Sequence, residues 1–188
     1  MSPLPKILVA VALALGLAAL GFTLAQEVWD AEKIAPFYPT PMAVAEKMLE
    51  AGELKPGELL YDLGSGDGRI VILAAHKFGA RAVGFEIDID LIRRSRARIA
   101  ELGLTENARI EKKDLLRANF SQPDLVTVYL LPGANDRIRP LLENQLRRGA
   151  RVVSHDFAFE GWTPEKTVNI LDSSEWERDE HKIYLYRR

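Results

Sequence analysis

Short, mostly apolar runs alternate along this chain with segments in which apolar residues recur at a helical period. A run at 59–63 precedes a helical period over 70–78, and the same pair of patterns returns at 80–87 and 88–102. Such runs are typical of strands buried on both faces. Further strands are expected at 108–112, 125–131, 150–154, 167–171 and 182–186, and further helices at 41–51 and 135–148. The pattern predicts an α/β fold, Rossmann-like and doubly wound, with a mostly parallel seven-stranded sheet and an antiparallel terminal strand.

Residues 1–25 differ from the rest, because Lys6 precedes an apolar run of 18 residues from Ile7 to Leu24. The run is just long enough to span a membrane as a helix, and the small residues near Ala25 also suit a signal-peptide cleavage site. We expect a signal peptide or a membrane anchor here, with a buried core helix as the alternative. Acidic residues follow the run, so the charge pattern places the bulk of the chain on the periplasmic or extracellular side, with the cytoplasmic face as the other possibility.

Residues 26–52 are expected to form a lead-in and the first helix, and residues 53–188 the main domain. The lead-in carries three prolines between Pro36 and Pro41, which forbid a helix before Pro41. Thr40 is a suitable N-cap for the helix that follows. The aromatic pair Phe37 and Tyr38 lies between the prolines and is either part of a rigid lead-in or a binding lip.

Composition restricts the chemistry. Lys and Arg total 25 against 27 Asp and Glu, a net charge of −2, so no nucleic-acid partner is expected. The absence of cysteine excludes disulfides, thiolate metal sites and cysteine nucleophiles. The three histidines, His76, His155 and His181, are far apart in the sequence and show no ligand spacing, so no metal is expected.

The run at 59–63 is followed by glycines at alternate positions, Gly64, Gly66 and Gly68, and then by the helical segment. Glycine lets a ligand approach the backbone, and the N–H groups at a helix start favour polar or anionic groups. A dinucleotide fingerprint would need glycine at the sixth position from Gly64, which is Arg69, and no Gly-Lys-Ser/Thr follows as in a P-loop. The turn is therefore the expected ligand site, but it is neither a dinucleotide-binding turn nor a P-loop.

The segment Asp62 to Gly68 resembles the first motif of class I S-adenosylmethionine (SAM) methyltransferases. The resemblance implies that SAM is the cofactor, that Glu86 binds the ribose hydroxyls and that Asp114 contacts the adenine. Strand ends of an open sheet converge on one crevice, which agrees with these roles. The expected cofactor-binding residues are Thr40, Asp62, Gly64, Ser65, Gly66, Asp67, Gly68, Glu86, Ile87, Asp114 and Leu115.

A more specific resemblance covers residues 34–188. The segments at 36–40, 62–71, 128–132 and 153–157 are together similar to one small methyltransferase family. That family includes the mitochondrial lysine methyltransferases of the ATP synthase c-subunit and of the adenine nucleotide translocase, archaeal protein-lysine methyltransferases, and bacterial members with an export-like N-terminus. The resemblance implies N-methylation of protein lysine. The fourth strand ends in Leu130-Leu131-Pro132 and lacks the Asn/Asp-Pro-Pro-Tyr/Phe of enzymes that methylate nucleic-acid amino groups.

A lysine acceptor must lose its proton, and an aromatic channel favours the neutral amine. Phe37 and Tyr38 are expected to form that channel and to attract the arriving cation, with Phe157 and Trp162 as further walls. Three residues after the fourth and fifth strands are expected to orient the acceptor or relay its proton, although a merely structural hydrogen bond is an equal alternative for the histidine. These residues are Asn135, His155 and Asp156.

Two other functions are open at this point. The same cofactor could serve a small-molecule, quinone or lipid acceptor, which a retained membrane anchor would favour. An exported domain would also meet little SAM, because the cofactor is made in the cytoplasm. The chain would then be a non-catalytic nucleoside-binding module.

Overall fold

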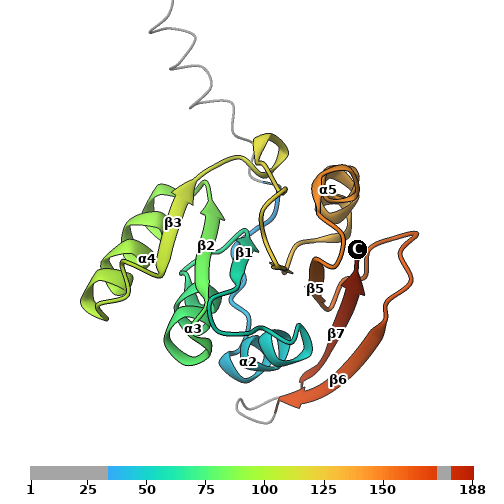
Figure 1. Cartoon of the computed structure of the whole chain (residues 1–188), viewed down its shortest axis with the longest axis horizontal. Coiled ribbons are helices and arrows are strands. Elements are labelled where there is room, and N and C mark those ends of the chain that lie inside the picture. Colours follow the sequence, from blue (N-terminus) through green and yellow to red (C-terminus); the bar gives the residue numbers. More distant parts are fainter. Residues whose placement is uncertain (1–33, 173–178) are drawn as a thin grey trace, which may run out of the picture. The chain divides into compact units, whose positions relative to one another are not determined.

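The computed structural model describes residues 34–172 and 179–188. The strands of these residues form one seven-stranded sheet, and Figure 1 shows helices on both of its faces. The strand order is β3-β2-β1-β4-β5-β7-β6. Strand β7 runs antiparallel to both β5 and β6, whereas the pairs from β3 to β5 are parallel. The strands are β1 Leu59–Leu63, β2 Arg81–Glu86, β3 Ala108–Lys112, β4 Leu125–Val128, β5 Arg151–His155, β6 Lys166–Asp172 and β7 Asp179–Arg187. The predicted fold class is confirmed.

The helices divide the hydrophobic core into two layers, one on each face of the sheet. They are α2 Met42–Ala51, α3 Arg69–Phe78, α4 Ile89–Glu101 and α5 Pro132–Gln145, with a short 3-10 turn η1 Leu115–Arg117. Helices α2, α3 and α4 pack with Leu60 of β1 in one cluster, and α5 packs with Tyr61 in the other. Neighbouring strand residues point to opposite faces, so both sides of β1 are buried, as its apolar run predicts.

The fourth strand and the following helix differ from the prediction. The strand was expected over 125–131, but its pairing with β1 and β5 ends at Val128, opposite Leu63 and Ser154. Helix α5 begins at Pro132 and ends at Gln145, instead of running from 135 to 148. Proline at the first helical position is favourable because it has no N–H to donate. Residues 129–131 therefore lie outside the sheet pairing, at the edge formed by the carboxyl ends of the parallel strands.

The predicted signal peptide or anchor at 1–25, and the apolar helix expected there, lie outside the described residues, as does the lead-in before Ile34. Within 34–172 and 179–188, no helix combines the length and the apolar character needed to cross a membrane.

Candidate active site

The glycine turn connects β1 to α3 through backbone conformations that side chains rarely adopt. Gly64, Gly66 and Gly68 have φ values of 75°, 54° and 79°. The N–H groups of Gly64 and Ser65 donate to the Phe85 carbonyl of β2, at 3.0 and 2.9 Å. These bonds hold the turn against the end of the neighbouring strand, so the alternate glycines of the sequence mark a real backbone requirement.

Glu86 ends β2 directly beside this turn. Its Oε2 accepts a hydrogen bond from the Gly66 N–H at 2.8 Å, and its Oε1 accepts bonds from the N–H groups of Ile87 and Asp88. Asp114 follows β3, the next strand in the sheet, where its Oδ1 accepts from the Leu116 N–H at 2.9 Å. Both carboxylates therefore lie at the carboxyl ends of adjacent parallel strands, as expected for one crevice.

Asp62 lies beneath the turn and is almost completely buried. Its Oδ1 accepts a hydrogen bond from the Thr127 hydroxyl of β4 at 2.7 Å. Burial raises the pKa of Asp62 to about 7, although the Thr127 hydrogen bond acts in the opposite direction. The carboxyl group consequently titrates near neutral pH, far above an ordinary aspartate.

Arg69 connects the turn to the lead-in. Its guanidinium pairs with the Asp67 carboxylate at 2.6 Å and donates from Nη1 to the Thr40 carbonyl at 2.8 Å. Phe37 lies over Gly66, because a Cβ placed on this glycine would be 2.5 Å from the Phe37 ring. The lead-in thus crosses the glycine turn, and a larger residue at Gly66 would have to displace the Phe37 ring.

This arrangement fits SAM. The turn provides close access to its backbone, and Glu86 offers a carboxylate beside it for vicinal hydroxyls. Asp114 and Leu115 lie at the end of β3, where an adenine would reach. When bound, SAM supplies a methyl group activated by its sulfonium. The individual contacts expected for the cofactor-binding residues remain predictions.

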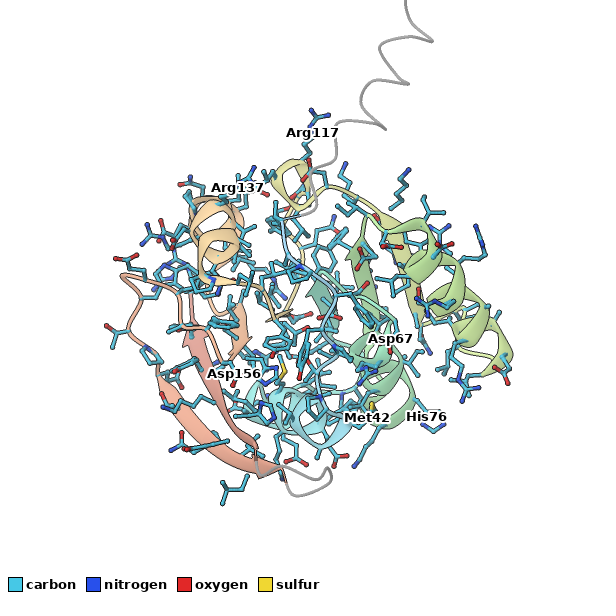
Figure 2. All side chains as sticks on the ribbon, turned by 180° about the vertical axis from the view of Figure 1, so that it is seen from behind. Met42, Asp67, His76, Arg117, Arg137 and Asp156 are labelled. Atoms are coloured by element: carbon cyan, nitrogen blue, oxygen red, sulfur yellow. The ribbon has the colours of Figure 1, made fainter. Side chains whose placement is uncertain are left out.

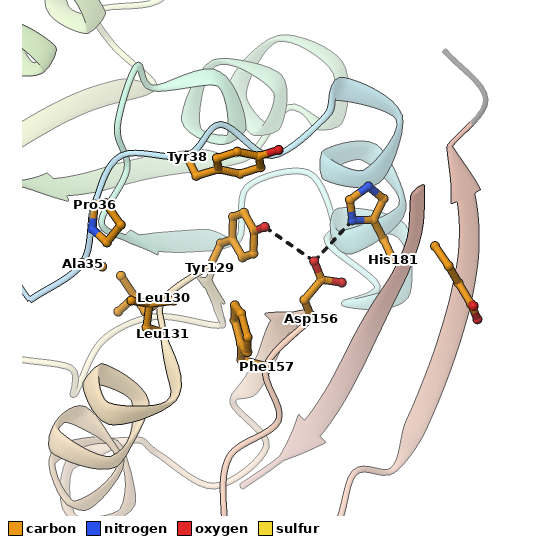
Figure 3. A pocket seen from close by; sticks show the side chains of 10 residues that line it. Ala35, Pro36, Tyr38, Tyr129, Leu130, Leu131, Asp156, Phe157 and His181 are labelled. Atoms are coloured by element: carbon orange, nitrogen blue, oxygen red, sulfur yellow. Dashed lines mark hydrogen bonds and ion pairs between the residues drawn. The ribbon is translucent and has the colours of Figure 1, made fainter. Parts of the chain in front are cut away.

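A second feature, which we call the aromatic pocket, opens next to the glycine turn with a volume of about 470 Å³. Leu130 joins the two regions, since it lines the pocket and lies 3.0 Å from the Cβ position of Gly64. Tyr38 and Tyr129 meet edge to face with centroids 6.3 Å apart, and Figure 3 shows them on one side of Asp156. The lining residues are Ala35, Pro36, Tyr38, Tyr129, Leu130, Leu131, Asp156, Phe157, Glu180 and His181.

Asp156 and His181 line the polar end of the pocket. Together with the fully buried His155 they form a set of three side chains that we call the His–Asp–His cluster. His155 Nε2 is 3.0 Å from His181 Nδ1, and Asp156 Oδ2 is 3.2 Å from the first atom and 3.3 Å from the second. Burial lowers the pKa of the His155 imidazole to about 4, against the attraction of the Asp156 carboxylate. Its other nitrogen, Nδ1, is 3.3 Å from the Thr40 hydroxyl.

Two of the three histidines, although far apart in the sequence, meet in this cluster. His155 and His181 lie 26 positions apart in the sequence, but the antiparallel pairing of β5 with β7 brings them into contact. His76 is exposed on α3, and Figure 2 shows it well away from Asp156. Only the β5–β7 register identifies His181, and the sequence contains no local signal for it.

The other residues that were predicted to contact the methyl acceptor do not all lie at the aromatic pocket. Tyr38, Asp156 and Phe157 line the aromatic pocket, whereas Phe37 lies over the glycine turn. Asn135 is buried and donates from Nδ2 to the Phe157 carbonyl at 3.2 Å, so it positions the pocket wall. Trp162 stacks on Phe159 and is not among the pocket's lining residues, so its prediction as a wall is wrong. Tyr129 also lines the pocket but was not predicted from the sequence. The feature that could have identified it is an aromatic residue with a hydroxyl group at the end of a strand.

The fold and the glycine turn define a class I SAM-dependent methyltransferase, and comparison with known proteins agrees. The chain is 40% identical over 152 residues to a protein-lysine N-methyltransferase of Saccharolobus islandicus, covering 80% of this chain and 92% of that protein. It is 35% identical to the lysine N-methyltransferase of the ATP synthase C-subunit from Rattus norvegicus, covering 77% of this chain and 66% of the relative.

Among solved structures, an RNA methyltransferase from Salinibacter ruber in complex with S-adenosyl-L-homocysteine is 42% identical, with a TM-score of 0.73. The match covers 80% of this chain and 93% of that one. The model of the ANTKMT methyltransferase domain matches residues 62–166. The chain belongs to this methyltransferase family, and SAM is its cofactor.

Proposed function

We propose that the chain transfers the methyl group of SAM to lysine side chains of protein. The observation that carries this proposal is the aromatic pocket beside the glycine turn, with Tyr38 and Tyr129 as walls and Asp156 at its polar end. Aromatic faces attract an ammonium group and then favour its neutral form as water is excluded. The names of the relatives from Saccharolobus islandicus and Rattus norvegicus agree with such an acceptor.

The charge around the pocket favours an amine over a nucleic acid. Asp156 and Glu180 both line it, and carboxylates there attract a lysine ammonium but repel phosphate groups. The net charge of −2 points in the same direction. The neighbour from Salinibacter ruber is named an RNA methyltransferase, so RNA is an acceptor that the test must include.

The test uses the full chain with SAM labelled in its methyl group and a fractionated cell lysate. We expect label in protein, and mass spectrometry of digests should place it on lysine. Glu86→Ala is the matched control, because loss of the cofactor carboxylate should abolish labelling of every fraction. Label that appears in RNA or in organic extract, and is absent from protein, would overturn the lysine assignment while leaving the methyltransferase activity intact.

We also propose, from the sequence alone, that residues 1–25 export or anchor the protein with its main domain outside the cytoplasm. The support is the apolar run from Ile7 to Leu24, with Lys6 before it and acidic residues after it. A reporter fused after Arg188 that is active only outside the cytoplasm would support this location. A reporter active only inside would contradict it, and would remove the difficulty of supplying an exported enzyme with SAM.

A further inference from the structure

The three inner atoms of the His–Asp–His cluster form a nearly equilateral triangle. Its sides are 3.0 Å between the two ring nitrogens and 3.2 and 3.3 Å from these nitrogens to Asp156 Oδ2. Imidazole nitrogen and carboxylate oxygen bind zinc at about 2.0–2.2 Å, so ligand atoms on one ion lie about 3.0 Å apart at right angles and about 3.4 Å apart at the tetrahedral angle. All three sides of the triangle fall in this range.

Hydrogen bonds between neutral imidazoles and the carboxylate do not satisfy all three contacts together. If both ring nitrogens carry a proton, both donate to Asp156, and two N–H groups then face each other across 3.0 Å. If only one carries a proton, the lone pair of the other nitrogen faces the carboxylate oxygen. In each of these states one side of the triangle is repulsive, whereas a cation above the triangle attracts all three atoms.

Surrounding groups hold Asp156 and His155 in this position. The Lys182 N–H donates to Asp156 Oδ1 at 2.8 Å, which leaves Oδ2 directed at the imidazoles and, at 3.5 Å, at the Tyr129 hydroxyl that donates to it. Asp156 itself has a φ of 57°, a conformation unusual for a residue other than glycine. The Thr40 hydroxyl lies 3.3 Å from His155 Nδ1, the outer nitrogen of that ring. An outer hydrogen bond of this kind is what orients a histidine that binds metal.

We propose that the His–Asp–His cluster binds a divalent transition-metal ion of the zinc type. Two imidazoles and one carboxylate suit zinc or iron(II) better than magnesium, which prefers oxygen ligands. Asp156 and His181 line the aromatic pocket, so the ion's remaining coordination positions face it and the ion enters from there. Glu180, at the same pocket, adds negative charge that attracts a cation. A bound ion would use the charge of Asp156, so Glu180 would then be the lining carboxylate that attracts an ammonium group. The metal site itself does not depend on lysine being the acceptor.

Cobalt(II) tests the site, because its visible absorption strengthens when protein ligands replace water in a site of low symmetry. The full chain is freed of metal with a chelator and titrated with cobalt in the absence of SAM and acceptor. We expect one cobalt per chain, an enhanced spectrum, and loss of that spectrum when zinc is added. Because no methyl transfer is measured, failure here is independent of failure of the proposed function.

Substitution of the proposed ligands shows whether the His–Asp–His cluster is the site that binds cobalt. His181→Gln and Asp156→Asn should each weaken cobalt binding by more than the about 10- to 100-fold that loss of an outer-shell partner costs. His76→Gln is the matched control, since that exposed histidine on α3 lies apart from the cluster and its loss should change nothing. Circular dichroism confirms that each variant is folded.

One further measurement does not depend on any variant. X-ray absorption of the zinc-loaded wild-type protein should show two imidazole ligands together with oxygen. Three results would each overturn the proposal: a cobalt spectrum that remains that of the aqueous ion, binding unchanged in folded His181→Gln, or zinc without imidazole scattering.

Discussion

The glycine turn and the aromatic pocket are neighbours at one edge of the sheet, but the chain builds them in different ways. The turn is a continuous segment, 64–68, whose backbone N–H groups donate to the Phe85 carbonyl and to the Glu86 carboxylate of the adjacent strand. The pocket combines four segments, 35–38, 129–131, 156–157 and 180–181, which meet mainly through side chains. A site made from local backbone leaves a motif in the sequence, whereas a site assembled from distant side chains leaves none.

The same difference predicts that amino-acid substitutions in the two regions have different effects. The turn depends on φ values that only glycine adopts easily and on buried carboxyl groups. The pocket depends on partly exposed rings such as Tyr38, which the rest of the core does not need. We therefore expect substitutions near the turn to change stability and SAM binding, and substitutions of the pocket's exposed rings to change acceptor kinetics alone.

The largest expected effect concerns Asp62, under the turn. Its pKa of about 7 in the folded state lies well above the ordinary value of 3.8, so the folded protein holds a proton that the unfolded chain releases between those pH values. Stability contributed by this proton is therefore lost as pH rises from about 4 to 7. The difference corresponds to about 4 kcal/mol, as an order of magnitude.

Asp62→Asn should remove this dependence. Urea denaturation of both proteins at a series of pH values should show the wild type losing stability relative to the variant across that window. Asp90→Asn, at an exposed acid whose side chain is 75% accessible, is the control and should follow the wild type. Parallel profiles for wild type and Asp62→Asn would show that folding does not raise the pKa of this carboxyl.

The next largest effect is expected for Glu86→Ala. Loss of charge-assisted hydrogen bonds to the cofactor hydroxyls should weaken SAM binding by about 3 kcal/mol, or about 100-fold in Kd, measured by calorimetry. Glu86→Gln keeps the shape but not the charge, and should lose less. Asp90→Ala serves as control, because this acid lies on α4 just after the same strand but is exposed. An unchanged Kd for Glu86→Ala would contradict the assignment of the cofactor site.

The sequence predicted the cofactor side of the fold closely because its signals are local. The strand at 59–63, the glycine turn and Glu86 follow one another, and the alternation of buried runs and helical periods gave the class of the sheet. The acceptor side was harder to predict. The strongly apolar run to Leu131 concealed the end of β4 at Val128, because periodicity does not show where sheet pairing stops.

His181 shows the same limit more clearly. In the sequence it is an isolated histidine among acidic residues, and the spacing rules for metal or catalytic sites do not apply to residues joined only by strand pairing. The register of β5 with β7, in which His155 faces Ile183, places it beside Asp156. Phe37 and Tyr38 differ for a related reason: adjacent residues of an extended segment point to opposite sides, so only Tyr38 reaches the pocket.

The smallest expected effect tests the acceptor side directly. Tyr38 is 65% exposed, so Tyr38→Ala should leave the fold intact while it removes one aromatic wall. Loss of its attraction for an ammonium group costs about 1 kcal/mol, so the KM for a lysine-containing substrate should rise about 5-fold with an unchanged Kd for SAM. Leu171→Ala removes an apolar side chain that is 72% exposed on β6 and is the matched control. If Tyr38→Ala instead weakened SAM binding and left KM unchanged, the lead-in would belong to the cofactor site, and the division between the two regions would not hold.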